Sequence, residues 1–380
     1  MVDLVVEERV KYPPFEPNRW EPQALPLAVQ RSVIGTYESK DEAMNELKQR
    51  APMFTLGGED TWMVEHRYFI GDELVESISE SSWVDQRPYP NVVKRQRRGW
   101  YLLPNPFHNI VRKFINSVVI LLLIALAYLA ISPILIMFNI PVYGIRTVRL
   151  GLLDYPVLAT FVVPLIFLPL MIRVFANLIE LKRQNTFLQR NLKDPIITFQ
   201  QTSVTDQPLA IEIEFPEWDD EWNHVDVFWR VGVLPPSREA LLKTLNRKAN
   251  AQPPPGLSTE LPHHWEEGLD DGTAGGEDAP MEIQEVKGGL YLRPMRIMAS
   301  GGTQRWKKGE TVSLDPPNPI WPGTFKSELI RVHWECILRI DRQRGGALFW
   351  VQPLNVAHHS HQTSLEHLPL YDGRSESDLR

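Results

Sequence analysis

Two long apolar runs in the middle of the chain constrain its fold more than any other feature. Over 115–138 the clearly polar side chains are one asparagine and two serines, and about 20 apolar residues suffice to cross a bilayer. A second run, 156–178, stays uncharged until Arg173. We therefore predict two transmembrane helices over these ranges, joined as a hairpin that occupies 114–181.

The basic residues near these runs predict the orientation in the membrane. Cytoplasmic flanks of membrane proteins carry an excess of Lys and Arg. The basic side chains at the outer ends of the two runs are Lys94, Arg95, Arg97, Arg98, Arg112, Lys113, Arg173, Lys182 and Arg183. The connecting loop holds Arg146 and Arg149, beside the aromatic Tyr143. We expect a two-pass integral membrane protein with both termini in the cytoplasm, and we expect all these residues to meet the membrane interface and its anionic headgroups.

Charge and cysteine content agree with cytoplasmic domains on either side of the hairpin. The formal net charge is −7 and the basic residues gather beside the apolar runs, so we expect no nucleic-acid partner. The single cysteine, Cys336, excludes an intrachain disulfide and a cysteine-based zinc site. The first residues have no basic and apolar signal-peptide pattern, so the hairpin is expected to direct membrane insertion.

The chain before the hairpin divides into three predicted parts. Residues 1–29 are rich in proline and read as an extended arm, either a strap packed on the next domain or a partner-binding segment that uses Phe15 and Trp20. Residues 30–84 form a small α+β unit. Residues 85–113 form a basic linker whose last part is either an interfacial helix or a continuation of the first span.

Local signals place a helix and a hairpin in the α+β unit. Ser39 with Glu42 predicts a capped helix, and the alternating segments around Gly71 and Asp72 predict a β-hairpin. The unit has few apolar positions, so we expect it to need a second surface for stability.

After the hairpin we predict a β-sandwich domain over 182–357. Its first residues, to Leu192, continue the second helix, and after Pro195 the alternation of apolar and polar residues predicts β structure. About seven strands are expected, which is the number found in an antiparallel β-sandwich. Trp229 on the third strand and the Trp334-x-Cys336 spacing on the penultimate one resemble immunoglobulin-type or arrestin-type sandwiches, although the second strand has no cysteine to pair with Cys336. The resemblance implies an all-β sandwich that binds other proteins.

Two features interrupt this region, and a tail follows it. Residues 249–280 are rich in proline, glycine and acidic residues and predict a flexible insertion. A cap at Ser237 predicts a short helix before the insertion. Residues 358–380 predict a polar tail.

No linear motif of catalysis or of phosphate, dinucleotide or metal binding occurs in the chain. We therefore expect no catalytic, cofactor-binding or metal-binding residues and no cofactor. The histidines of the tail offer imidazole ligands but no rigid element to hold a metal. His333 and Glu335, with Asp341, could form a scattered catalytic site if their face of the strand met solvent, but a polar cross-strand contact is the simpler interpretation.

The segment 217–222 places Trp218 and Trp222 among four carboxylates. Tryptophans dominate interface energies when a partner buries them, so both are candidate partner-binding residues together with Phe15 and Trp20. The alternative is that these tryptophans cap the sandwich.

These observations favour a non-enzymatic scaffold or accessory subunit that docks other protein subunits, or further copies of itself, beside the membrane. An oligomeric pore or transporter is the first alternative, because Pro133, Pro164 and Pro169 lie inside the apolar runs. A membrane-anchored enzyme without a linear motif is the second.

Overall fold

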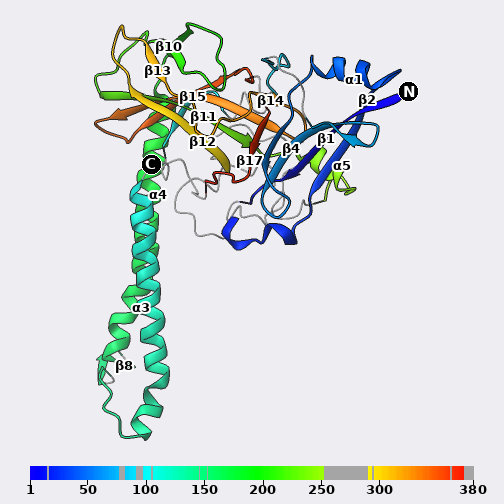
Figure 1. Ribbon diagram of the computed structural model, residues 1–380. Helices are drawn as coiled ribbons and strands as arrows, with labels where there is room; N and C mark the ends of the chain where they lie inside the picture. The colour runs from blue at the N-terminus through cyan, green and yellow to red at the C-terminus, as the bar shows by residue number, and fades with distance from the viewer. Residues whose placement is uncertain are drawn as a thin grey trace. The chain divides into compact units, whose positions relative to one another are not determined.

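The computed structural model describes residues 1–14, 17–76, 82–90, 97–103, 106–144, 146–151, 153–251, 290–292, 295–359 and 362–371. The protein is a mixed α and β structure in which β-sheets predominate, and the described residues include four helices. The chain forms two compact units (Figure 1). Unit 1 contains the chain up to Leu103 and again from Asn191 onward, and unit 2 contains Pro104–Arg190.

The first sheet of unit 1 has the strand order β17-β3-β4-β1-β2, with β5 paired to β4. Its strands are β1 (Val2–Lys11), β2 (Ala28–Tyr37), β3 (Phe54–Gly57), β4 (Met63–Ile70), β5 (Glu73–Leu74) and β17 (Thr363–Leu365). Helix α1 (Lys40–Leu47) packs Ala43 and Leu47 against Leu4 and Tyr68 of the sheet. The predicted cap is confirmed, since Ser39 Oγ accepts the backbone N–H of Glu42 at 3.2 Å.

Both ends of the chain belong to this sheet. The predicted arm over 1–29 contains β1, which lies between β2 and β4 (Figure 1), and two 3-10 turns, Pro17–Arg19 and Pro22–Ala24. The predicted polar tail contains β17, which pairs in parallel with β3. The predicted hairpin is confirmed by β4 and β5, where Ile70 faces Glu73 across the turn at Gly71.

The second sheet of unit 1 has the order β12-β11-β15-β16-β6, with β14 paired to β15. Its strands are β6 (Gly99–Leu102), β11 (Trp222–Leu234), β12 (Ile297–Arg305), β14 (Phe325–Lys326), β15 (Arg331–Arg342) and β16 (Leu348–Leu354). Strands β11 and β15 pair along their whole length and are buried on both faces for most of it. The segment predicted as a basic linker therefore contributes a strand, β6, to this sheet.

The third sheet of unit 1 has the order β13-β10-β9, and its strands are β9 (Ile196–Phe199), β10 (Leu209–Glu214) and β13 (Val312–Leu314). It contacts the second sheet where Trp229 of β11 donates its indole N–H to the carbonyl of Asp315 at 2.7 Å. A buried tryptophan that joins two antiparallel sheets fits a β-sandwich. Helix α5 (Arg238–Thr244) begins at the predicted cap, Ser237. The predicted insertion lies largely outside the described residues.

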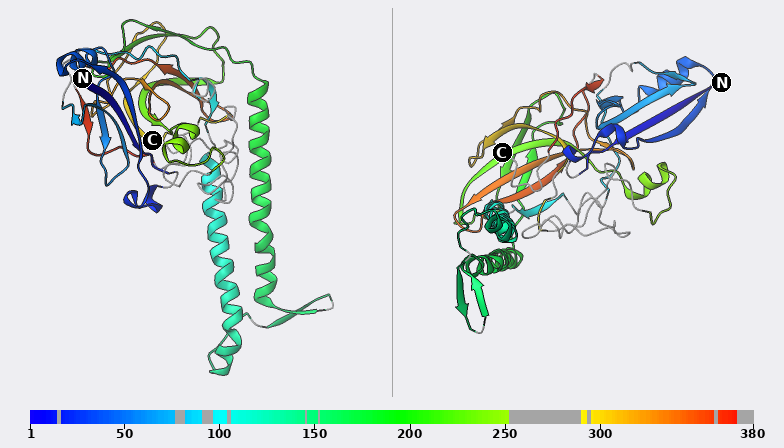
Figure 2. Two further views of the ribbon diagram at one scale, coloured as in Figure 1. Left: turned by 90° about the vertical axis from the view of Figure 1, so that its right-hand side faces the viewer. Right: turned by 90° about the horizontal axis from the view of Figure 1, so that it is seen from below.

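Unit 2 consists of α3 (Pro106–Met137), the short strands β7 (Thr147–Leu150) and β8 (Leu153–Pro156), and α4 (Val157–Gln189). Helices α3 and α4 lie side by side (Figure 2). Two small apolar clusters join them, one around Val111 and Ala176 and one around Val118, Leu122 and Val162. Helix α3 is continuous from Pro106, so the segment considered as an interfacial helix continues the first predicted span.

Among the described residues, one helical stretch, Lys113–Met137, is long and apolar enough to cross a membrane. Only 11% of its most apolar window is buried within the protein, so most of its side chains face outward. A predominantly apolar stretch of 25 residues that buries so little of itself is unlike the core helix of a soluble domain. The second predicted crossing stays a prediction.

Candidate functional site

The ionisable residues considered for catalysis form a buried cluster in the second sheet. The Glu335 carboxylate accepts two hydrogen bonds from Arg97, each 2.8 Å long, and one of 2.5 Å from Nε of Arg230, the residue opposite it on β11. Nε2 of His333 lies 3.1 Å from the same carboxylate. All four side chains are almost completely inaccessible to solvent.

Burial corrects the expectation that this face of β15 could meet solvent. Burial alone would raise the pKa of Glu335, but the guanidinium groups of Arg97 and Arg230 outweigh it and hold the pKa well below its usual range. Burial lowers the pKa of His333. Asp341 lies in a different environment, near Asn223 and partly exposed. The arrangement is a polar contact within the sheet, as the simpler interpretation held.

The two tryptophans proposed as partner anchors differ in exposure. Trp218 is 42% exposed, whereas Trp222, the first residue of β11, is 6% exposed and packs against Phe215 and Trp100. The Trp218 ring stacks on Trp306 with the centroids 5.5 Å apart and the planes 21° apart. Trp218 can therefore offer aromatic surface to a partner. Trp222 is buried and its ring contacts the Trp218 ring in a T-shaped arrangement, which agrees with the alternative that these tryptophans cap the sandwich.

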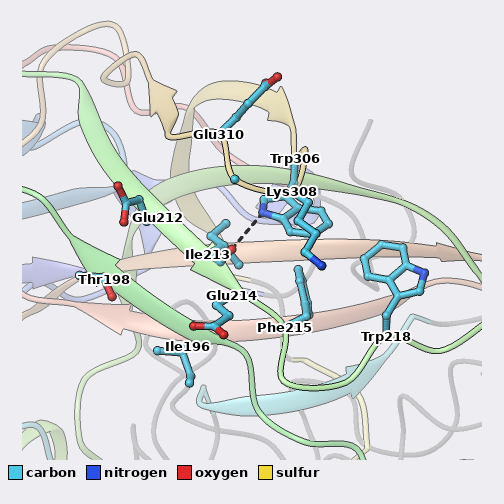
Figure 3. Close-up of a pocket in the computed structure, with 11 residues that line it drawn as sticks. Ile196, Thr198, Glu212, Ile213, Glu214, Phe215, Trp218, Trp306, Lys308 and Glu310 are labelled. Carbon is cyan, nitrogen blue, oxygen red and sulfur yellow. Dashed lines mark hydrogen bonds between the residues drawn. The ribbon is translucent and has the colours of Figure 1, made fainter.

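Trp218 belongs to the rim of a surface cavity of about 670 Å³, which we call the acidic aromatic groove (Figure 3). The groove is lined by Ile196, Thr198, Glu212, Ile213, Glu214, Phe215, Trp218, Trp306, Lys308, Gly309 and Glu310. Its floor is the outer face of the third sheet. One end is formed by the contacting rings of Phe215, Trp218 and Trp306. Figure 3 shows the Trp306 ring beside Phe215, with Glu212 and Glu214 on the strand that leads to them.

The period of two along β10 builds the floor. Ile211 and Ile213 turn inward and are buried, so Glu212 and Glu214 turn outward. On β9, Thr198 pairs with Glu212 and Ile196 with Glu214, which puts all four side chains on the same face.

The side chain of Trp306 supplies a hydrogen bond to the third sheet beside this floor. Strand β13 begins at Val312, which lies opposite Ile211. The carbonyl of Ile213, two residues further along β10, therefore has no partner on β13. The indole N–H of Trp306 donates to that carbonyl at 3.2 Å. Trp306 thus satisfies a backbone acceptor that would otherwise lack a partner in the sheet, and the same bond fixes its ring at the end of the groove.

The charges of the groove are mainly negative. Glu212 and Glu214 stand on the floor, and Glu310 lies on the rim within 3.6 Å of Lys307. Lys308 is the cation among the lining residues, and Gln200 donates to the Glu212 carboxylate at 2.8 Å. Aromatic faces beside carboxylates attract cations, because the ring face and the carboxylate both carry negative potential.

The structure separates the residues predicted at the membrane interface. Arg97 is removed from that set, because its guanidinium is buried on Glu335. Arg183 is largely covered and pairs with Glu180 at 2.9 Å. The exposed members are Arg98, Lys113, Tyr143, Arg146, Arg149 and Lys182, and Arg173 is half-buried.

Some predicted residues lie outside what the structure describes. Phe15, Lys94 and Arg95 fall outside the described residues, as does the side chain of Arg112. Trp20, the remaining partner candidate, is half-buried.

The histidines of the predicted tail are not one solvated group. His358 is buried, and its Nδ1 accepts the backbone N–H of Gly323 at 3.0 Å. His361 lies outside the described residues. Within the described ranges, His, Cys, Asp and Glu side chains form no cluster with the geometry of a metal site.

Comparison with known proteins identifies no relative. No family model matches the sequence, and neither a curated protein nor a solved structure matches it. The candidate site therefore rests on the chemistry of its own residues.

Proposed function

We propose that the protein is a non-enzymatic, membrane-anchored docking protein, a scaffold or accessory subunit whose unit 1 binds other protein subunits in the cytoplasm. One contrast carries this proposal. The ionisable residues of catalytic type, His333 and Glu335, are sealed inside a sheet, whereas the acidic aromatic groove lies open at the surface with Trp218 on its rim. Exposed tryptophan beside a concave polar surface is typical of a binding site.

Strand pairing supports a two-pass anchor. β6 lies before α3 in the chain and pairs with β16, which lies after α4, and β3 pairs with β17 in the same way. The chain segments on the two sides of the helices must therefore share one compartment. A single crossing by α3 would separate them, so a membrane-spanning α3 requires a return crossing, and the apolar part of α4 is the segment available for it.

The distribution of basic residues supports cytoplasmic termini. Lys113 and Lys182 are exposed at the helix ends nearest unit 1 in the chain, with Arg98 also exposed shortly before α3. The loop between the helices carries Arg146 and Arg149. The excess of Lys and Arg outside the hairpin follows the positive-inside rule, and these side chains are positioned in the sequence to meet anionic headgroups.

The two packed sheets of unit 1 support the docking role in general terms. We keep the interpretation that they form a sandwich of immunoglobulin or arrestin type, an architecture often used for binding. The interpretation rests on the strand pattern and on Trp229, which joins the two sheets.

The test is a pull-down of the full-length protein in mild detergent, followed by mass spectrometry of stoichiometric companions. Wild type, Trp218→Ala and Trp20→Ala are compared, since the two tryptophans were both candidate anchors and lie far apart in sequence. We expect companions that are lost with Trp218→Ala and retained with Trp20→Ala.

Three other outcomes would contradict parts of this proposal. A wild-type protein that purifies as a lone monomer would reject the docking function. A homo-oligomer without other companions would favour the pore alternative and lead to conductance measurements in bilayers. Companions that depend on Trp20 alone would move the docking site from the groove to the N-terminal segment.

A further inference from the structure

Strand β9 presents an open edge at the margin of the acidic aromatic groove. It is the last strand of the order β13-β10-β9, and among the described residues no strand pairs with its outer side. The backbone N–H of Gln200 donates to the carbonyl of Ala210 at 3.2 Å, just past the end of β9. This bond shows which residues of β9 direct their backbone N–H and C=O groups toward β10 and which direct them toward the open edge.

Hydrogen-bonded and non-hydrogen-bonded positions alternate along an antiparallel pair. Because Gln200 and Ala210 form a hydrogen-bonded pair, Thr198 and Ile196 are the next such positions on β9. The N–H and C=O groups of Ile197 and Phe199 therefore point away from β10, toward the open edge. They form a regular row of donors and acceptors that a further strand can use.

The edge lacks the usual protection against strand addition. Exposed edges in proteins are commonly blocked by lysine, proline or a bulge, and the sequence of β9, Ile-Ile-Thr-Phe, contains no such residue. Ile196 on the outer face is 54% exposed and Phe199 on the inner face is 40% exposed, so neither face of the strand is covered.

We propose that β9 is the docking edge for an extended basic segment of a partner protein, which adds as a strand and reaches into the acidic aromatic groove with Lys or Arg side chains. This inference rests on the proposed docking function and specifies its partner. The added strand would lie about 4.8 Å beyond β9. Alternate side chains of this strand would lie beside Thr198 and Ile196, on the same face of the sheet.

The charge of the groove selects the partner's side chains. Glu212 and Glu214 lie one strand further in than Thr198 and Ile196, roughly 10 Å from the added backbone by strand spacing. Only long side chains can approach these carboxylates from there, and only cations gain from them. The exposed face of Trp218 offers a second contact that favours an ammonium or guanidinium group.

The experiment titrates the full-length protein in detergent with a fluorescein-labelled peptide of alternating valine and lysine, followed by fluorescence anisotropy. A matched peptide with glutamate in place of lysine tests the charge. Two further lysine peptides carry N-methyl groups, one on every valine and the other on every lysine. A bound strand uses only one of its two edges, so one methylated peptide should bind like the parent and the other should lose about tenfold or more in affinity.

Variants of the protein test the same strand pairing and the same charge contacts. Phe199→Pro removes an outward N–H without removing a bond to β10, and proline is tolerated where a strand edge faces solvent. Phe199→Ala removes the same side chain and keeps the N–H. We expect Phe199→Pro to weaken the lysine peptide several-fold relative to Phe199→Ala, and we expect Glu212→Gln with Glu214→Gln to weaken it about tenfold.

The outcomes separate this inference from the docking function. Equal binding of both methylated peptides, equal effects of the two Phe199 variants, or equal binding of the glutamate peptide would each overturn strand addition of a basic segment, as would no binding at all. Companions retained in the pull-down under those results would leave the docking function standing with a different site. Peptide binding without any companion would instead reject the docking function alone.

Discussion

Arg97 and Glu335 are 238 positions apart in the chain, and their side chains form a paired hydrogen bond with two contacts of 2.8 Å inside unit 1. Arg97 lies shortly before β6, and Glu335 lies in the middle of β15. The pair therefore joins chain from before the helical unit to chain from after it. Arg230 adds a second guanidinium to the same carboxylate.

Replacing the carboxylate should be costly, because two buried guanidinium groups would lose their counter-charge. We expect Glu335→Ala to lower the free energy of unfolding by about 3 to 5 kcal/mol. The exposed Glu366→Ala is the matched control and should change it by less than about 0.5 kcal/mol. Tryptophan fluorescence during denaturation of the full-length protein measures both. Equal stability of the two variants would show that the cluster does not stabilise the second sheet.

Gly301 should be intolerant of any side chain. A Cβ atom there would lie 2.2 Å from Nε1 of Trp229 and 2.5 Å from the carbonyl of Asp315, the two groups that form the hydrogen bond between the sheets. We expect Gly301→Ala to destabilise the protein by about 1 to 3 kcal/mol. Gly58→Ala is the control, since its Cβ would meet only Thr61 at 3.8 Å. The thermal midpoints of the two variants should differ by several degrees, and similar midpoints would contradict the close packing at Gly301.

His66 should make the stability of unit 1 fall in acid. It is buried between Phe54 and Phe325, and burial lowers its pKa to about 3. The folded protein therefore keeps His66 neutral, while the unfolded chain takes up a proton below about 6.5, so stability decreases as the pH falls, by at most about 1.4 kcal/mol per unit.

Comparison with His66→Gln isolates this contribution. Glu8 lies 3.8 Å from Nδ1 of His66, and burial raises the pKa of its carboxyl, so Glu8 acts in the opposite direction in both proteins. We expect the unfolding free energy of wild type to fall more steeply between pH 6.5 and 4.5 than that of His66→Gln. Parallel curves would show that His66 is already charged or reachable by solvent in the folded state.

Cys336 should leave the native protein unreactive and allow its topology to be mapped. It is completely buried, and burial raises the pKa of its thiol to about 12. We expect no labelling of wild type by a membrane-impermeant maleimide. In sealed inside-out vesicles, Ser32→Cys and Glu366→Cys should react, and Tyr143→Cys should react only after detergent is added. Labelling of all three variants in sealed vesicles would contradict two passes.

Local signals predicted the elements that depend on short-range chemistry. The capped helix at Ser39, the cap at Ser237 and the hairpin at Gly71 are formed by residues within a few positions of one another, so the sequence alone reveals them. The apolar stretch of α3 follows from composition in the same way. Trp218 was identified from the carboxylates that surround it in the sequence, and its 42% exposure is a finding of the structure.

The elements that the sequence did not reveal depend on distant partners. Residues 1–29 were predicted as an extended arm, but β1 is an inner strand of the first sheet, where Glu7 is buried and pairs with Arg31 and Arg67. Arg97 was predicted at the membrane interface. Its partner, Glu335, lies 238 positions further along the chain, so the sequence does not reveal the pair. Phe215 and Trp306 complete the groove, yet Trp306 lies 93 positions from Ile213 in the chain and only the fold brings its indole N–H onto that carbonyl.

The parallel pairing of β17 with β3 also sets the order in which the protein can mature on the ribosome. β3 is synthesised more than three hundred residues before its partner, and Leu102 of β6 precedes its partner Leu348 of β16 by about 250 residues. Helices α3 and α4 emerge in between. The first sheet therefore stays incomplete until Thr363–Leu365 is synthesised, and a chain released before Thr363 would lack a strand of its first sheet.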